Sequence, residues 1–141
     1  MYAEKLAWYL KITLQKTKSM KTSETIVLLG ASSNPNRPGY MAGKFLHNKG
    51  FQLHAVAQKK GQLDGLAIHD TSNPPEHADT ISVFLNPDRQ KNFYDYILNL
   101  HPKRIIFNPG TENPELIELA TQRNIQIIKG CTIAMLMNGV L

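Results

Sequence analysis

The amino-acid sequence predicts an α/β protein whose Rossmann-like, doubly wound parallel sheet has five strands in the order 3-2-1-4-5 and helices on both faces. Two observations predict this fold. Short apolar runs alternate with segments of helical periodicity, and near-continuous apolar runs are typical of parallel strands that are buried on both faces. Right-handed crossover connections between such strands then give a doubly wound sheet. The chain has 141 residues, which suits one domain with one hydrophobic core.

Each predicted element has a local signal in the sequence. The strands are expected over residues 25–30, 51–57, 80–85, 104–107 and 125–128. Helices are expected over residues 39–48, 86–100 and 113–123, with a last helical turn within 132–141. Gly50 ends the first helix, Pro87 suits the first turn of the second, and Asn113 opens the third. Residues 58–65 are expected to be a polar connection, and the extended piece at 66–69 is not counted as a strand of the sheet.

The positive charge is concentrated at the N-terminus. The whole chain has a formal net charge of +5. Residues 1–21 carry five lysines against Glu4, a net +4, whereas the remainder carries 11 basic and 10 acidic residues, a net +1. We therefore expect residues 1–22 to be a basic extension, either helical or frayed, and residues 23–141 to be the domain. A nearly neutral domain has no broad electrostatic attraction for nucleic acid.

Composition limits the class of protein. The chain is 42% apolar and 19% charged, which is ordinary for a globular protein. Its one cysteine, Cys131, excludes an internal disulfide framework and a four-thiolate zinc site. The longest apolar runs fall far short of the roughly 18 residues of a membrane span, and no secretory signal pattern is evident. We expect a cytoplasmic protein that binds no membrane.

The first predicted strand is followed by a loop with several polar groups. Ligands of doubly wound sheets bind at the carboxyl ends of the strands, which here are residues 30–38, 56–61, 85–89 and 108–113. In the first of these loops Gly30 permits a tight turn, and serine, asparagine and arginine side chains follow it. This is the position where backbone N–H groups and a helix dipole bind phosphate. Only the first glycine of the G-x-G-x-x-G fingerprint is present, so an ordinary strand-to-helix turn stays an alternative.

Two lysines, Lys59 and Lys60, follow closely after the second predicted strand. An NAD site usually has an acidic residue at this place, which binds the ribose hydroxyl. Two lysines instead favour a ligand with an extra phosphate on the ribose, and both NADP and coenzyme A carry one. A pair of solvated lysines is the alternative explanation.

A series of short motifs follows a characteristic order between residues 26 and 136. They are Leu29-Gly30-Ala31-Ser32, Asn34-Pro35, Arg37-Pro38, Gly50-Phe51, Val56 with Lys60-Gly61, Phe84 to Pro87, Pro109-Gly110, Asn113-Pro114-Glu115 and Cys131. In these motifs the sequence resembles the small stand-alone CoA-binding proteins of the YccU type. Those proteins are similar to the CoA-binding domain of the succinyl-CoA synthetase alpha subunit. The resemblance implies a Rossmann-type domain that holds coenzyme A or an acyl-CoA.

The resemblance also implies roles for individual residues. The first loop would lie against the ligand phosphates, Lys60 would contact the nucleotide end, and the loop at Asn108 would line the same cleft. Together with the strand-end argument, this gives the predicted cofactor-binding residues: Gly30, Ala31, Ser32, Ser33, Asn34, Pro35, Arg37, Val56, Lys59, Lys60, Asn86, Pro87, Asn108, Pro109 and Gly110.

No catalytic or metal-binding residue is predicted. The sequence has no G-x-S-x-G elbow and no P-loop lysine, and its five histidines lack the spacing of a metal site. Glu112 and Glu115 lie near the predicted cleft, but carboxylates at a helix start commonly serve the helix dipole. Cys131 is either a reactive thiol or, as we expect, a half-buried inert one.

Three functions remain open from the sequence. The leading one is a non-catalytic or accessory protein that binds the small molecule coenzyme A or an acyl-CoA, with a homodimer left open. The second is an NADP-dependent reductase or a redox-sensing nucleotide-binding protein, for which about 120 residues of domain leave little room for a substrate pocket. The third is an interaction module that has lost its ligand.

Overall fold

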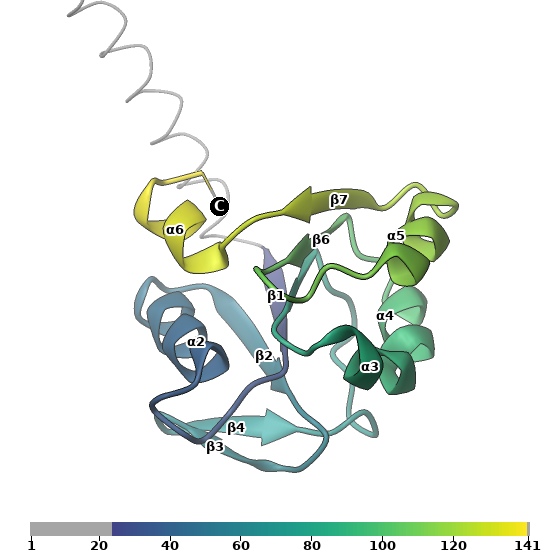
Figure 1. Cartoon of the computed structure of the whole chain (residues 1–141). Helices are drawn as coiled ribbons and strands as arrows, with labels where there is room; N and C mark the ends of the chain where they lie inside the picture. Colours follow the sequence, from purple (N-terminus) through teal and green to yellow (C-terminus); the bar gives the residue numbers. More distant parts are fainter. Residues whose placement is uncertain (1–23, 141) are drawn as a thin grey trace, which may run out of the picture.

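Apolar strands alternate with amphipathic helices along residues 24–140, the part of the chain that the computed structural model describes (Figure 1). Its strands are β1 (Thr25–Leu29), β2 (Gln52–Val56), β3 (Gly61–Leu63), β4 (Leu66–His69), β5 (Thr80–Val83), β6 (Arg104–Phe107) and β7 (Gln126–Lys129). Its helices are α2 (Pro38–Asn48), α3 (Pro87–Gln90), the 3₁₀ helix η1 (Lys91–Phe93), α4 (Tyr94–Asn99), α5 (Pro114–Thr121) and α6 (Thr132–Met137). The predicted basic extension over 1–22 lies outside the described residues.

The strands form one sheet in the order β3-β4-β2-β1-β5-β6-β7. All neighbouring strands are parallel except β3 and β4. The predicted α/β class with a mostly parallel sheet is therefore confirmed, but five strands in the order 3-2-1-4-5 are wrong. The strand at Thr80–Val83 was expected beside residues 51–57, whereas Thr80 in fact pairs with Ile26 of β1. The place beside β2 is taken by Leu66–His69, the extended piece that was left out of the predicted sheet.

A tight hairpin accounts for the two additional strands. Leu63 pairs with Leu66 across a two-residue loop, Asp64-Gly65, and both loop residues have positive φ, 50° and 81°. Such loops match the twist of the flanking strands, and Asp-Gly is a favoured sequence for them. The predicted polar connection over 58–65 is thus wrong in its second half, which forms β3 and the turn.

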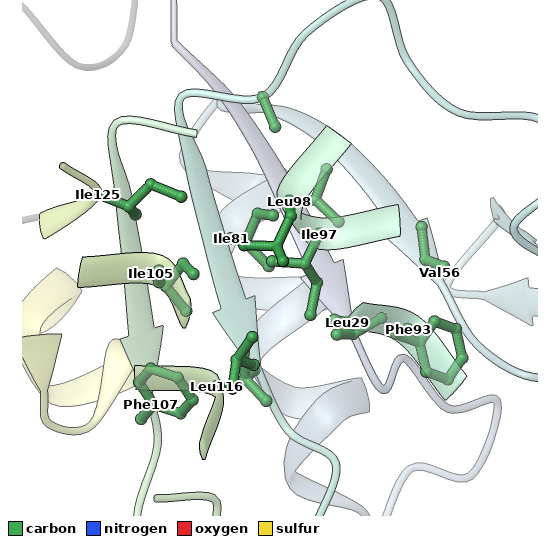
Figure 2. Packing of buried hydrophobic residues seen from close by; sticks show 14 residues of the cluster. Leu29, Val56, Ile81, Phe93, Ile97, Leu98, Ile105, Phe107, Leu116 and Ile125 are labelled. Carbon is green, nitrogen blue, oxygen red and sulfur yellow. The ribbon is translucent and has the colours of Figure 1, made fainter. Parts of the chain in front are cut away.

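The two faces of the sheet are covered by different helices. Side chains alternate along β1, so Val27 and Leu29 pack on one face and Ile26 and Leu28 on the other. The first face meets α4 and α5 in the cluster that Figure 2 shows. The second face meets α2 and α6. The predicted arrangement of helices on both faces is therefore observed.

The predicted helix over 86–100 is divided into α3, η1 and α4. Gln90 is fully buried and its amide donates to the carbonyl oxygens of Leu85 (2.8 Å) and Thr111 (2.7 Å). The change from α3 to the 3₁₀ helix η1 falls directly after this residue. The predicted helical turn near the C-terminus is α6. None of the described helices is long and apolar enough to cross a membrane.

Candidate functional site

A cleft of about 480 Å³ opens at the carboxyl ends of β1, β2 and β5. Its walls are the loop after β1, the loop between β2 and β3, and the segment from β5 to η1. The lining residues are Gly30, Ala31, Ser32, Ser33, Arg37, Pro38, Gly39, Ala57, Gln58, Lys59, Lys60, Gly61, Ile68, Phe84, Leu85, Arg89 and Phe93. The structure thus brings together seven of the predicted residues: Gly30, Ala31, Ser32, Ser33, Arg37, Lys59 and Lys60.

Backbone contacts fix the first loop at the mouth of the cleft. The N–H groups of Gly30 and Ala31 both donate to the carbonyl oxygen of Val56, at 2.9 and 3.0 Å. Gly30 has φ +96°, a conformation that favours glycine, and an added Cβ would lie 3.0 Å from the backbone of Phe84 and Leu85. Val56 is therefore a predicted site residue that is buried and acts through its carbonyl group alone.

The loop leads directly into α2, whose N-terminus faces the cleft. Arg37 is the N-cap residue, and no side chain caps the helix. The backbone N–H groups of Ser32 and Ser33 likewise donate no hydrogen bond to any of the described residues. Exposed N–H groups beside a helix N-terminus bind anions through hydrogen bonds and the helix dipole.

Four cationic side chains line the cleft, namely Arg37, Lys59, Lys60 and Arg89, and no aspartate or glutamate is among the lining residues. Of these, Lys60 has a nearby carboxylate, since its Nζ lies 3.9 Å from Asp70 Oδ2. Hydrogen bonds from the Ser72 hydroxyl and N–H hold the pKa of Asp70 below its usual range. The cleft is therefore suited to a ligand with several negative charges.

Apolar side chains form the remaining walls. Phe84, Leu85 and Phe93 lie on the β5 side, and Ala57 and Ile68 on the side of β2 and β4. A site with convergent polar groups and apolar walls fits a ligand that combines phosphates with a ring or a chain.

Arg89, Phe84 and Gln58 line the cleft but are not among the predicted site residues. Arg89 lies within the strand-end segment 85–89 that the sequence singles out, and it belongs to the first turn of α3. The sequence thus contained the signal for Arg89, namely its place at the start of a helix that begins at the carboxyl edge of the sheet, where ligands bind.

Asn34, Pro35, Asn86 and Pro87 do not line the cleft. The Asn34 side chain accepts from the N–H of Asn36 at 3.0 Å, which shapes the loop. Asn86 is the N-cap of α3 and accepts from the N–H of Arg89 at 3.0 Å. These residues form the framework of the site, as Asn and Pro commonly do at turns and helix starts.

Asn108 is buried, and both polar atoms of its side chain make hydrogen bonds within the protein. Its amide donates to Val83 O (2.8 Å) and Ser82 Oγ (3.1 Å), and its Oδ1 accepts from the N–H of Thr132 at 2.8 Å. It therefore joins the ends of β5 and β6 to the start of α6. The predicted Pro109 and Gly110 are exposed and lie outside the cleft lining.

Replacing Asn108 by alanine should lower the unfolding free energy by about 2 kcal/mol, because it leaves the buried N–H of Thr132 without its acceptor and removes the side-chain donor to Val83 O and Ser82 Oγ. Urea unfolding measures this cost. An unchanged midpoint would show that water replaces the lost amide, and the structural role would then be wrong.

A stacked pair of histidines lies in the part of the sheet next to the cleft. The rings of His54 and His69 are 4.4 Å apart and nearly parallel. Burial and the neighbouring His69 lower the pKa of His54 below 6.5, against an opposing contribution from the Asn73 backbone. His54 Nε2 is buried with no hydrogen-bond partner.

Acidification should therefore destabilise the fold through His54. The unfolded chain binds more protons than the folded one as the pH falls through 6.5 toward the folded pKa, so stability decreases over that window. Urea midpoints at about pH 7.5 and about pH 5.5 measure the loss, which should be smaller in His54→Asn. The exposed His47→Asn is the control. Equal losses in wild type and His54→Asn would contradict the assignment.

The other candidate groups lie apart from the cleft lining. Glu112 accepts from the N–H of Gly110 at 2.9 Å. Cys131 is exposed, so the expected half-buried thiol is wrong. Within residues 24–140, no three His, Cys, Asp or Glu side chains group closely enough to hold a metal ion.

The sequence matches a known protein family, and the fold matches several solved structures. Residues 24–137 match the family described as the CoA binding domain. A solved structure of an uncharacterized protein is 38% identical, with a TM-score of 0.78, and covers 85% of this chain and 99% of that one. A Thermus thermophilus protein (19% identity, TM-score 0.76, 92% and 98% covered) and a hypothetical protein from Pyrococcus horikoshii OT3 (19%, 0.74, 86% and 87%) share the fold.

Proposed function

Because the chain belongs to the CoA binding domain family, we propose that it binds coenzyme A or an acyl-CoA in the cleft and that it acts as an accessory protein without a reaction of its own. The proposed domain is residues 23–141, and the proposed ligand site is the cleft together with the loops that frame it.

The observation that carries the proposal is the charge of the cleft. Four cations and no carboxylate line it, while the chain outside residues 1–21 is nearly neutral. Coenzyme A carries a diphosphate and a 3′-phosphate, so its charge matches the cleft. The described residues thus fit this ligand, and we assign the diphosphate to Ser32, Ser33, Arg37 and the N-terminus of α2.

We assign the 3′-phosphate to the lysines after β2. Lys59 and Lys60 follow the strand end where ribose is bound in doubly wound folds. Ala57 and Ile68 offer an apolar wall nearby, which suits the adenine ring. Phe84, Leu85 and Phe93 on the opposite side suit the pantetheine chain.

NADP is the second candidate, because the same two lysines suit a 2′-phosphate. Thermal unfolding with CoA, acetyl-CoA, NADPH and NAD separates the two ligands. A ligand present at 100 times its Kd stabilises the folded state by about 2.7 kcal/mol. We expect such a shift with CoA or acetyl-CoA and none with NADPH or NAD. A shift with NADPH alone would favour the second candidate, and no shift with any ligand would exclude both.

Replacing Lys60 by alanine should weaken CoA binding by about 1–3 kcal/mol, because a charge-assisted hydrogen bond to phosphate is lost. Dephospho-CoA, which lacks the 3′-phosphate, should lose much less affinity than CoA. Titration calorimetry measures both ligands, with Lys44→Ala, an exposed lysine of α2 outside the cleft lining, as the control. Equal losses for CoA and dephospho-CoA would contradict the contact with the 3′-phosphate.

A further inference from the structure

A second hollow, of about 430 Å³, lies between the loop that joins β4 to β5 and the segment formed by η1 and α4. We call it the α4 hollow, and it shares no lining residue with the cleft at the strand ends. Asn92, Asp95 and Asn99 follow one another at three- and four-residue spacing, so one side of η1 and α4 forms a wall of the hollow. Ile97 and Leu98 of α4 pack into the core instead. A hollow of this volume is large enough for a small molecule.

Tyr96 lines the α4 hollow, and its hydroxyl oxygen is buried with no hydrogen-bond partner among the described residues. The side chain packs against the core cluster that α4 covers. Burial raises the pKa of Tyr96 to about 12, so the phenol is neutral near neutral pH. A buried hydroxyl group without a partner is costly and rare in native proteins. This group therefore points to a ligand whose polar group meets it in the hollow.

The charge of the α4 hollow identifies the kind of ligand. Glu76 of the loop and Asp95 of α4 belong to different walls. Neither carboxylate has a hydrogen bond or an ion pair with another described residue. No lysine, arginine or histidine is among the lining residues, whereas Pro74, Pro75 and Leu100 add apolar surface. Unpaired carboxylates beside apolar surface suit a cation that is carried on a hydrocarbon chain.

We propose that the α4 hollow binds a short aliphatic diamine or polyamine. One ammonium group would pair with Asp95 and donate to the hydroxyl oxygen of Tyr96, and the other would pair with Glu76. The methylene chain would lie against the two prolines of the loop. Ammonium groups are donors only, which matches the acceptors of this hollow. A bare metal ion fits less well, because no three His, Cys, Asp or Glu side chains within residues 24–140 group closely enough to hold one. The proposal does not rest on what the cleft at the strand ends binds.

Titration calorimetry of the full chain with diaminobutane, at neutral pH and constant ionic strength, tests the proposal. We expect saturable binding, with butylamine, which has one ammonium group, bound several times more weakly. Asp95→Asn, which removes the charge and keeps the shape, should weaken diamine binding by a factor of about 10. The matched control is Glu118→Gln, at an exposed position of α5 outside the hollow lining, and it should bind as the wild type does.

Two further variants test the individual contacts. Tyr96→Phe should weaken diamine binding several-fold, whereas its thermal midpoint without ligand should be unchanged or raised, because an unpartnered buried hydroxyl is removed. Glu76→Gln should abolish the advantage of diaminobutane over butylamine, because the second ammonium group then has no carboxylate. Thermal midpoints of all variants near that of the wild type ensure that they are folded.

Several results would overturn the proposal. One is the absence of saturable binding, and another is an equal loss of affinity in Asp95→Asn and Glu118→Gln, since general charge attraction would then explain the binding. Unchanged affinity in Tyr96→Phe would contradict the contact with the hydroxyl group. Displacement of diaminobutane by an equal concentration of magnesium chloride would show that the hollow takes any divalent cation.

Discussion

Reversing the charge of Arg37 and Lys59 together should reduce CoA affinity by a factor on the order of 10² to 10⁴. Each side chain would lose a charge-assisted hydrogen bond of about 1.5–3 kcal/mol and would then repel the phosphates. Both residues are exposed and line the cleft, and neither has a carboxylate partner within the described residues. The fold should therefore tolerate Arg37→Glu/Lys59→Glu, so that calorimetry reports binding alone.

The control for this double variant is Lys44→Glu/Lys49→Glu. It changes the net charge by the same amount at two exposed positions of α2 and its C-cap, outside the cleft lining. Its CoA affinity should stay near that of the wild type at moderate salt, because neither lysine lines the cleft and salt screens exposed charges. If the control loses as much affinity as the cleft variant, overall charge rather than the cleft binds the ligand.

Replacing Gly39 by alanine should destabilise the protein by about 3 kcal/mol. A Cβ at this position would lie 2.3 Å from the carbonyl oxygen of Gly30. That oxygen is part of the loop whose N–H groups are held by Val56, so the clash cannot be relieved by turning a flexible side chain. The helix α2 and the first loop would have to separate, and CoA binding should fall together with stability.

Gly61→Ala is the matched control for this variant. Gly61 also lines the cleft, but an added Cβ would meet only Ile68, at 3.8 Å. Its stability should be unchanged or slightly raised, since alanine restricts the unfolded chain more than glycine does. Urea unfolding compares the two variants. A Gly39→Ala protein as stable as Gly61→Ala would show that the contact between α2 and the loop is not tight.

The sequence predicted the class of the fold because apolar runs and helical periodicity are strong signals of a parallel sheet. It did not predict the strand order. That order depends on Leu66–His69, which is predicted from the sequence only as a brief extended piece, and on the Asp64-Gly65 turn, which joins it to its hairpin partner. Without this strand, the segment at Thr80–Val83 was assigned to the wrong neighbour.

The position of the cleft could be predicted from the strand ends, whereas the role of each residue there could not. The rule that ligands bind at strand ends selects both Asn108 and Arg37. The side chain of Asn108 makes three buried hydrogen bonds within the protein, whereas Arg37 lines the cleft. Whether a polar side chain points inward or outward depends on tertiary contacts between loops far apart in the sequence.

A crystal structure of the protein with CoA tests the central proposal most directly. We expect the diphosphate between residues 32–37 and the N-terminus of α2, and the 3′-phosphate within hydrogen-bond distance of Lys59 or Lys60. Density for the ligand away from the cleft, or phosphates that contact none of Ser33, Arg37, Lys59 and Lys60, would contradict it.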